Sequence, residues 1–356
     1  MKISVLLAKQ FENFIIMKDI GKISIVMPCY RSEMFISDMI KDVIDQTYTN
    51  WELIIVSNGK DQEAQLDIIR EFSSKDNRIR LFSIDEAGVS NARNIGMQFA
   101  TGNWLTFIDA DDRLKNIHLS SLSEGVKDET DIVIGGFSEH ISGRTERVSI
   151  PAPELSCIDK KFIEMFDGLK RSPWNKLLRV TTLRNWGGVF DINLTINEDA
   201  LFFYSLYCHT QNITSVPMSG YIYNFGNSGS ALSKYHNCYE LSEQLVLKYE
   251  KEMICLADTD DEWKHLQFNR AQYFSSYFSI CNFFKGKKVL PYRVLKDKIK
   301  RTLGNSEVKS AVISRKGSPC NINLKIFNFC VLHNTPYTLY LIFTARKLWK
   351  KFSKKG

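Results

Sequence analysis

Three carboxylates within four positions are the clearest chemical signal in this sequence. Asp109, Asp111 and Asp112 lie in the segment FIDADD, directly after the apolar run WLTFI. Carboxylates this close repel one another and raise each other's pKa, and a divalent cation bound by their oxygens would relieve that repulsion. The cluster therefore predicts a site for Mn²⁺ or Mg²⁺. A solvated turn with an acidic helix cap is the alternative.

A second acidic pair, Glu198 and Asp199, stands at the expected start of a helix, INEDALFFYSLY. Acidic side chains are favourable in the first turn of a helix because the helix dipole is positive there. A carboxylate can also act as a general base toward a hydroxyl group. Capping and catalysis are compatible, and the pattern of the pair alone does not separate them.

An alternation of strand-like and helix-like segments must position these groups. The order β-α-β-α-β-α-β indicates an open α/β sheet with helices on both faces. In such sheets ligands bind at the carboxyl ends of the strands, and Pro28–Tyr30, Ser57–Asn58 and Asp109–Asp112 all follow expected strands. The expected strands are 22–28, 51–59, 79–84 and 104–108, and the expected helices are 32–46, with Ser32 as its N-cap, 62–72 and 89–102.

Charge and apolar runs exclude several classes of protein. The formal net charge is +7, and the last eleven residues hold six Lys or Arg residues and no acidic residue. The rest of the chain is nearly neutral, so a broad basic face for nucleic acid is not expected. No run approaches the ~20 apolar residues of a membrane span. The N-terminal patch lacks a cleavage site, so no signal peptide is expected. The eight cysteines have no zinc spacing and indicate reduced thiols in a cytosolic protein.

The tail, 336–356, is expected to form one basic amphipathic helix. Such a helix, with Trp and Phe on its apolar edge, suits an anionic membrane surface, and a helix packed on its own domain is the alternative. The lysine and arginine side chains fill the side opposite the apolar arc. That arc holds Leu341, Ile342, Ala345, Leu348, Trp349 and Phe352.

Four segments, in order, carry a family resemblance: ISIVMPCYR, DQTYTNWELIIVSNG, GVSNARNIGMQFATGNWLTFIDADD and NEDALFF. Together they resemble the family 2 inverting glycosyltransferases of GT-A fold, over about residues 22 to 225. The resemblance implies a mixed sheet and transfer of a sugar from a nucleotide-diphosphate donor, usually a UDP-sugar, onto an acceptor hydroxyl. By analogy it also implies work at the cytoplasmic membrane face, building a surface polysaccharide on a lipid carrier.

The same resemblance implies a role for each matching residue on the donor side. Asp111 would bind the metal, and Asp109 would bind donor hydroxyls or share the metal. Asn58 stands where the family often has an Asp that accepts the uracil N3–H, a hydrogen bond that an amide oxygen can also accept. Arg31 departs as well, because Asn is frequent at that position. The implied donor-binding residues are Pro28, Tyr30, Asn58, Arg93, Asp109 and Asp111.

On the acceptor side, the resemblance implies that Asp199 is the general base and that Glu198 orients the acceptor. Trp174 and Lys176 lie in WNKLLR, which is similar to the family's acceptor segment, and a core role for Trp174 is equally compatible. The chain is thus expected to comprise four parts. They are an extension (1–20), a GT-A domain (21–230), a helical region (231–335) and the basic tail (336–356).

Two other functions stay open at this point. A sugar-nucleotide nucleotidyltransferase has a related core but predicts a Gly-rich loop after the first strand, where this chain has MPCYRSE. A non-catalytic nucleotide-sugar-binding scaffold would keep the fold without turnover. Two acidic motifs disfavour the scaffold because both are intact: the DxD motif, Asp109 and Asp111, and the ED motif, Glu198 and Asp199. The departures at Arg31 and Asn58 leave the scaffold open.

Overall fold

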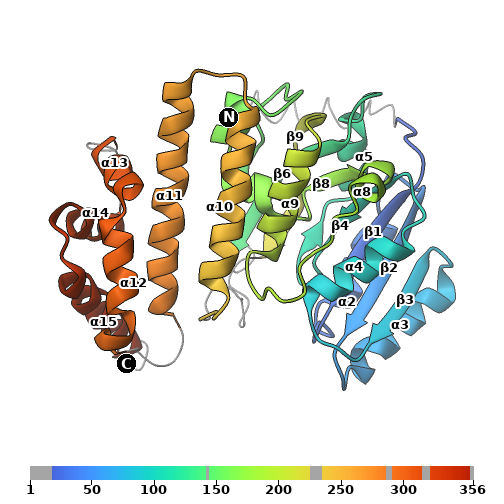
Figure 1. Cartoon of the computed structure of the whole chain (residues 1–356). Helices are drawn as coiled ribbons and strands as arrows, with labels where there is room; N and C mark the ends of the chain where they lie inside the picture. The colour runs from blue at the N-terminus through green and yellow to red at the C-terminus, as the bar shows by residue number, and fades with distance from the viewer. Residues whose placement is uncertain (1–17, 142–143, 225–234, 286–290, 315–320, 353–356) are drawn as a thin grey trace, which may run out of the picture. The chain divides into compact units, whose positions relative to one another are not determined.

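The computed structural model describes residues 18–141, 144–224, 235–285, 291–314 and 321–352 (Figure 1). Its contacts divide the chain into two compact units. The first, here called the sheet unit, comprises residues 1–193 and 205–227, and the second, the helical unit, comprises residues 194–204 and 228–356. Most of the expected extension, 1–20, lies outside the described residues.

One mixed sheet forms the centre of the sheet unit. Its order is β3-β2-β1-β4-β8-β6-β9-β5, with β7 paired to β6. Strands β1 to β4 run parallel, β8 is antiparallel to β4 and β6, and β9 is parallel to β6. This confirms the mixed sheet that the resemblance implied. The strands are β1 Ile23–Cys29, β2 Trp51–Asn58, β3 Ile79–Ile84, β4 Trp104–Phe107, β5 Arg113–Leu114, β6 Ile132–Ile141, β7 Arg144–Ser149, β8 Lys176–Arg179 and β9 Ile213–Asn224.

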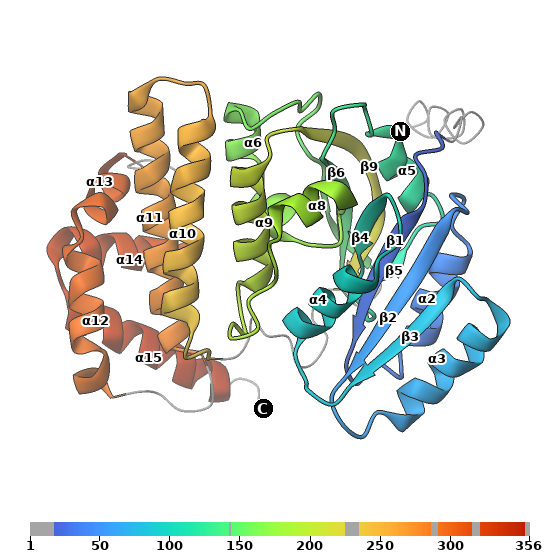
Figure 2. The same cartoon turned by 45° about the vertical axis from the view of Figure 1, so that its right-hand side comes forward.

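The two strands β1 and β2 are buried along their whole length, as central parallel strands covered on both faces should be. Helices α2 (Ile36–Ile44) and α3 (Glu63–Lys75) cover one face, and α4 (Val89–Phe99) covers the other (Figure 2). Short helices complete this unit: α5 His118–Glu124, α6 Lys160–Glu164, α7 Asp167–Arg171 and α8 Val180–Trp186.

The expectation that Ser32 caps the helix after β1 is wrong. Helix α2 begins at Ile36, and its N-cap position, Phe35, makes no side-chain cap. The Ser32 hydroxyl instead donates to Gln65 Oε1 of α3 at 2.7 Å. The hydroxyl is thus engaged by a neighbouring helix, which a reading of the local pattern could not reveal.

Helices build the helical unit around a core of its own. Figure 1 shows α10 and α11 as a long antiparallel pair. The core of the helical unit includes Ile280, Leu303, Phe327 and Leu339. Among the described residues, no helix is both long and apolar enough to span a bilayer. The helices are α10 Tyr239–Leu256, α11 Asp261–Phe283, α12 Tyr292–Gly304, α13 Ser306–Ser314, α14 Ile322–His333 and α15 Pro336–Phe352, and α9 (Glu198–His209) contributes residues to both units.

A buried histidine makes stability in the sheet unit depend on pH. His118 is 2% exposed, and among the described atoms its Nε2 has no hydrogen-bond partner. Burial lowers the pKa of His118 from 6.5 to about 4. The unfolded chain therefore takes up a proton first as the pH falls below 6.5, so this contribution is intact above that pH and is lost toward about pH 4.

We therefore expect urea unfolding to show a loss of about 2–3 kcal/mol between about pH 7.5 and about pH 4.5 that depends on His118. The substitution His118→Leu should remove this part of the pH dependence, because an aliphatic side chain has no proton to bind. His140, which is more exposed on β6, serves as the control for removing an imidazole from this unit, and the loss assigned to His118 should persist in His140→Leu. An equal pH dependence in His118→Leu and wild type would contradict the assignment.

Candidate active site

The carboxyl ends of three parallel strands meet at one edge of the sheet. The register places Cys29 of β1 beside Ser57 of β2, and Val26 of β1 beside Phe107 of β4. Tyr30 follows β1 directly, Asn58 is the last residue of β2, and Asp109 lies two residues after the end of β4. Tyr30, Asn58 and Asp109 therefore lie along a single edge of the sheet, as the strand pattern predicted.

Tyr30 forms an aromatic surface at this edge. Its side chain is 48% exposed, and a Cβ placed on Gly59 would lie 2.7 Å from its Cε2 atom. Gly59 also has a φ of 97°, a region that favours glycine. The ring thus rests on the glycine backbone, and the Arg31 guanidinium lies 5.2 Å from its centroid.

Asn58 links the end of β1 to the loop before α4. Its side chain is 3% exposed. Its Nδ2 donates to the Cys29 carbonyl at 3.0 Å, and its Oδ1 accepts from the Gly88 N–H at 3.0 Å. An amide oxygen has two lone pairs, so Oδ1 keeps capacity for one more hydrogen bond. Pro28, by contrast, is a buried β1 residue opposite Val56.

Arg93 is buried and paired with the first aspartate of the DxD triplet. It is 4% exposed, so it is not a solvated arginine on the outer face of α4. Its Nη2 lies 3.1 Å from Asp109 Oδ1, and its guanidinium carbon lies 5.3 Å from the centroid of the Phe190 ring. One oxygen of Asp109 is therefore already engaged by a cation, and Asp111 is the better candidate for a metal ligand.

Tyr221 of β9 ties the acidic loop together, and the sequence did not point to it. Its hydroxyl donates to Asp112 Oδ2 at 2.7 Å and accepts from the Asp109 N–H at 3.0 Å. Asn224 adds two contacts, because its N–H donates to Asp112 Oδ1 and its Nδ2 donates to the Asp111 carbonyl. Asp112 is thus a structural residue of the loop, 2% exposed.

The acidic loop creates a strongly negative field. Burial, together with the charges of Asp109 and Asp111, raises the pKa of Asp112 well above its ordinary value. Burial and the same acidic charges raise the pKa of Tyr223 to about 12. Burial raises the pKa of the Cys29 thiol as well, and the two aspartates add to that effect. A cation at Asp111 would relieve this excess of negative charge.

The protein side chains at this edge could hold a divalent cation only if a bound ligand supplied further oxygen atoms. Among the described residues, no three His, Cys, Asp or Glu side chains are grouped closely enough to hold a metal by themselves. Mg²⁺ and Mn²⁺ sites are often built from one or two carboxylates together with substrate phosphates. The half-buried Asp111 borders a pocket of about 480 Å³ that Phe35, Arg113 and His140 also line. Asp111 thus offers a carboxylate that a phosphate-bearing ligand could complete.

Trp174 and Lys176, the predicted acceptor residues, lie inside the sheet unit. Trp174 is 5% exposed and stacks on Tyr221, with ring centroids 4.3 Å apart. Lys176 is fully buried, and its ammonium group donates to the carbonyl of Leu169 and to Asn175 Oδ1, each at 2.8 Å. In this structure Trp174 supports the tyrosine that holds the acidic loop, and Lys176 caps the chain around α7.

The acidic pair opens α9, as predicted. Glu198 and Asp199 are half-buried in its first turn, and Asp199 Oδ1 accepts from the Ala200 N–H at 2.7 Å. Both residues belong to the helical unit, whereas Asp109 and Asp111 belong to the sheet unit. A half-buried carboxylate at a helix start can cap the helix and accept a proton.

Comparison with known proteins identifies the N-terminal part. Residues 24–187 match the model of the glycosyl transferase family 2. The chain is 29% identical over 210 residues to the uncharacterized glycosyltransferase EpsJ of Bacillus subtilis, covering 56% of this chain and 60% of EpsJ. It is 38% identical over 91 residues to the Escherichia coli UDP-Glc:α-D-GlcNAc-diphosphoundecaprenol β-1,3-glucosyltransferase WfgD, covering 25% of this chain and 35% of WfgD. The chain thus spans less than two thirds of each of these relatives.

A solved structure extends the likeness of fold to both units. The structure of Staphylococcus aureus TarS 1–349 in complex with UDP-GlcNAc has a TM-score of 0.66 at 19% identity, and the match covers 92% of each chain. This likeness confirms the GT-A fold followed by a helical region. The matched family model makes residues 24–187 of this chain a domain of the glycosyl transferase family 2.

Proposed function

We propose that this chain transfers a sugar from a UDP-sugar to a hydroxyl group of a saccharide or lipid-linked saccharide, with inversion at the anomeric carbon. The observation that carries the proposal is the single sheet edge where an aromatic surface, a buried arginine and a carboxylate cluster meet. Each of these suits one part of a nucleotide-diphosphate sugar. The product would contribute to a cell-surface polysaccharide.

The donor would lie along this edge with its base on Tyr30. The exposed ring offers a stacking surface, and Asn58 Oδ1 can accept one further hydrogen bond, as an imide N–H of uracil would need. Arg93, held beside Asp109, would place a fixed positive charge near the diphosphate. The solved structure of TarS 1–349, which shares the fold, is a complex with UDP-GlcNAc, and this supports a uridine nucleotide as donor.

Asp111, with help from Asp109, would hold Mn²⁺ or Mg²⁺ together with the donor phosphates. The metal supplies positive charge to the diphosphate, which becomes more negative as the bond to the sugar breaks. Tyr221 and Asn224 keep the loop in place by bonding Asp112 and the backbone of Asp109 and Asp111. The rigid loop would thus present its carboxylates in one fixed arrangement.

Asp199 would remove the proton from the acceptor hydroxyl. The hydroxyl oxygen then forms a bond to the anomeric carbon from the face opposite the diphosphate, the old carbon–oxygen bond breaks, and its electron pair leaves with the nucleoside diphosphate. The configuration inverts because attack and departure occur on opposite faces. Glu198, its neighbour in the first turn of α9, would orient the acceptor.

The direct test incubates the purified protein with Mn²⁺ and UDP-glucose, UDP-GlcNAc or GDP-mannose, with GlcNAc-diphosphoundecaprenol as acceptor. WfgD carries this acceptor in its name. We expect release of UDP, and a product whose anomeric configuration by NMR is opposite to that of the donor. Binding of donor without any turnover would support a scaffold instead. Release of pyrophosphate from UTP and a sugar phosphate would support a nucleotidyltransferase.

A glycine substitution tests the aromatic surface. Gly59→Ala places a methyl group where the Tyr30 ring lies, so we expect the affinity for UDP, measured by calorimetry, to fall by about tenfold. Gly187→Ala is the matched control, because Gly187 also has a positive φ, 69°, but nothing lies within 4 Å of its added Cβ. Both variants should lose about 1 kcal/mol of stability. Equal UDP affinities in the two variants would contradict the role of Tyr30.

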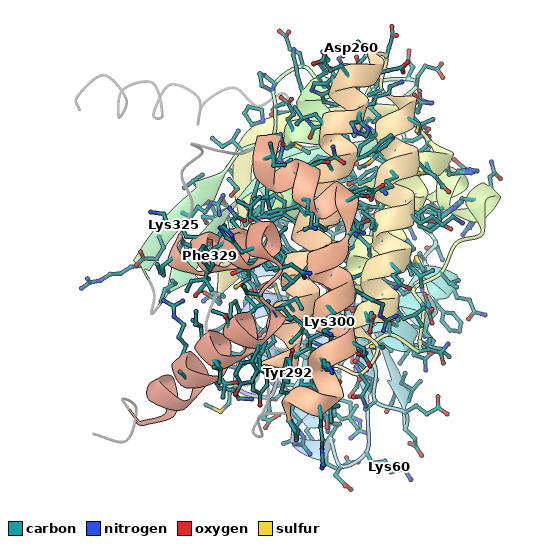
Figure 3. All side chains as sticks on the ribbon, turned by 60° about the vertical axis from the view of Figure 1, so that its left-hand side comes forward. Lys60, Asp260, Tyr292, Lys300, Lys325 and Phe329 are labelled. Atoms are coloured by element: carbon teal, nitrogen blue, oxygen red, sulfur yellow. The ribbon has the colours of Figure 1, made fainter. Side chains whose placement is uncertain are left out.

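The proposed location is the inner face of the plasma membrane, through the C-terminal helices. Helix α15 packs on the core of the helical unit through Leu339 and Phe343, yet Leu341 on the same helix is 46% exposed. Helix α14 exposes Phe329 and Leu332 to about half, and Figure 3 shows Lys325 beside Phe329 on its outer side. No acidic residue occurs after Glu307 in the sequence, which suits anionic lipids.

Vesicle binding tests this location. The double substitution Phe329→Ser and Leu332→Ser should reduce co-sedimentation with phosphatidylglycerol vesicles by about tenfold, because it removes two exposed apolar side chains from the basic surface. Leu241→Ser, on α10 and 57% exposed, is the control and should bind as wild type does. Neutral phosphatidylcholine vesicles should retain little of any variant. Wild-type protein that sediments with neither kind of vesicle would contradict the proposed location.

A further inference from the structure

The chain just before the proposed base has an unusual backbone conformation. Asn197 precedes α9 with a φ of 63°, a left-handed region in which asparagine is one of the few tolerated residues other than glycine. Its carbonyl accepts the first helical hydrogen bond, from the Leu201 N–H at 2.9 Å. The direction in which Glu198 and Asp199 leave the turn is therefore set by the conformation of Asn197.

Two residues of α10 hold that conformation. The Asn197 side-chain Nδ2 donates to Glu243 Oε1 at 2.8 Å and to Ser242 Oγ at 3.1 Å. Glu243 is 4% exposed and Ser242 is fully buried. Both hydrogens of the amide are thus used inside the helical unit. A hydrogen bond to a buried carboxylate is among the stronger ones available to a neutral amide.

A second contact, two residues earlier, fixes the same segment. The Thr195 hydroxyl lies 2.9 Å from His236 Nδ1. His236 is itself held by Asn282 of α11, which bonds both its N–H and its carbonyl. Residues of the helical unit therefore anchor the chain at Thr195 and again at Asn197, directly before the acidic pair.

We infer that Glu243, through its bond to Asn197, is a positioning residue that sets the orientation of Asp199 for proton abstraction. The inference rests on the proposed role of Asp199 and adds to it a function for the C-terminal helices. Glu243 touches neither substrate nor the reacting atoms in this account. It acts by keeping the first turn of α9 in one conformation, so that the carboxylate does not have to be reoriented in each catalytic cycle.

The test compares kcat, the donor KM and the melting temperature of four single variants and one double variant, using UDP release in the presence of GlcNAc-diphosphoundecaprenol. Glu243→Ala removes the acceptor for the amide, and Glu243→Gln restores one. Asn197→Gly removes the amide but keeps the positive φ without strain. Glu252→Ala is the control on the same helix, because Glu252 is exposed and pairs only loosely with Lys248, at 3.8 Å.

We expect Glu243→Ala and Asn197→Gly each to lower kcat by about 10–100-fold, with the donor KM within about twofold of wild type. Glu243→Gln and the control should keep most of the wild-type kcat. The double variant Glu243→Ala with Asn197→Gly should be no slower than the worse single variant, because each substitution removes the same contact between Asn197 and Glu243. A purely structural role would instead lower the melting temperature of the variants and leave kcat per folded molecule unchanged.

Two outcomes overturn the inference. One is a kcat near the wild-type value in folded Asn197→Gly. This variant keeps the test decisive even if Glu243→Ala does not fold. The other is a double variant whose losses multiply, which would show two independent contributions. If wild-type protein transfers no sugar while it binds UDP, the proposed function itself fails, which is a distinct result from active wild type with active variants.

Discussion

Replacing Asp111 by alanine should reduce sugar transfer by about 10³-fold or more, because the proposed cation, which would neutralise the departing diphosphate, would lose its principal protein ligand. Wild-type activity should disappear with a chelator and return with Mn²⁺, whereas Asp111→Ala should respond to neither. The fold should survive, since the substitution removes one of three mutually repelling carboxylates, and the Asp111 backbone carbonyl keeps its bond from Asn224. UDP release at saturating donor and the melting temperature together measure these effects.

The matched control is Asp85→Ala. Asp85 is an exposed aspartate that directly follows β3, at the same edge of the sheet as the acidic cluster. Its removal changes the net charge by the same amount but takes away no ligand of the proposed metal site. Asp85→Ala should therefore transfer sugar at close to the wild-type rate. If Asp111→Ala retains more than about a tenth of wild-type activity, the metal role of this carboxylate is wrong.

The second large effect is expected at Asp199. Asp199→Asn keeps the size and a hydrogen-bond acceptor toward the Ala200 N–H, but an amide does not accept a proton from the acceptor hydroxyl. We expect kcat to fall by about 10²–10⁴-fold, with UDP affinity unchanged, because in the proposed site the nucleotide would be bound by Tyr30, Asn58 and the acidic loop of the sheet unit and not by Asp199. Measuring transfer and UDP binding on the same preparation separates loss of the base from loss of the donor site.

A neighbouring carboxylate serves as the comparison for Asp199. Glu198→Gln changes the adjacent residue in the same helical turn and should cost less than Asp199→Asn, since an orienting group contributes less than the group that accepts the proton. The acid limb of the pH–kcat profile, if Asp199 is the base, should vanish in Asp199→Asn and persist in Glu198→Gln. The opposite order of the two losses would exchange the roles proposed for these residues.

Much of the sheet unit could be predicted because its signals are local. The continuous apolar runs of β1 and β2 identify buried parallel strands without any knowledge of their partners. Strand β8 could not be found in this way. It consists of Lys176–Arg179, with a cation at each end, and it is a strand because it pairs with β4 on one side and β6 on the other. Pairing between segments far apart in the chain leaves little trace in a short sequence window.

The site divides along the same line. Tyr30, Asn58 and Asp111 lie at or just after the ends of strands in recognisable segments, so the strand pattern alone predicts that they share one edge of the sheet, and their roles stay predictions. Tyr221 was missed because its bond to Asp112 joins residues 109 positions apart. The spacing within WNKLLR likewise did not reveal that Trp174 faces inward, since a tryptophan ring can stack on a sugar or pack in a core.

Helix α9 has a consequence for how such proteins can be recombined. Its first residues, up to Tyr204, group with the C-terminal helices, and the rest, from Ser205, group with the sheet. A chimaera that exchanges only residues after 228 would pair a foreign set of helices with the native segment 194–204 and break the contacts to Asn197 and Thr195. Exchange of the helical unit between relatives therefore calls for three junctions, two of them flanking 194–204, so that this segment is exchanged together with its own helices.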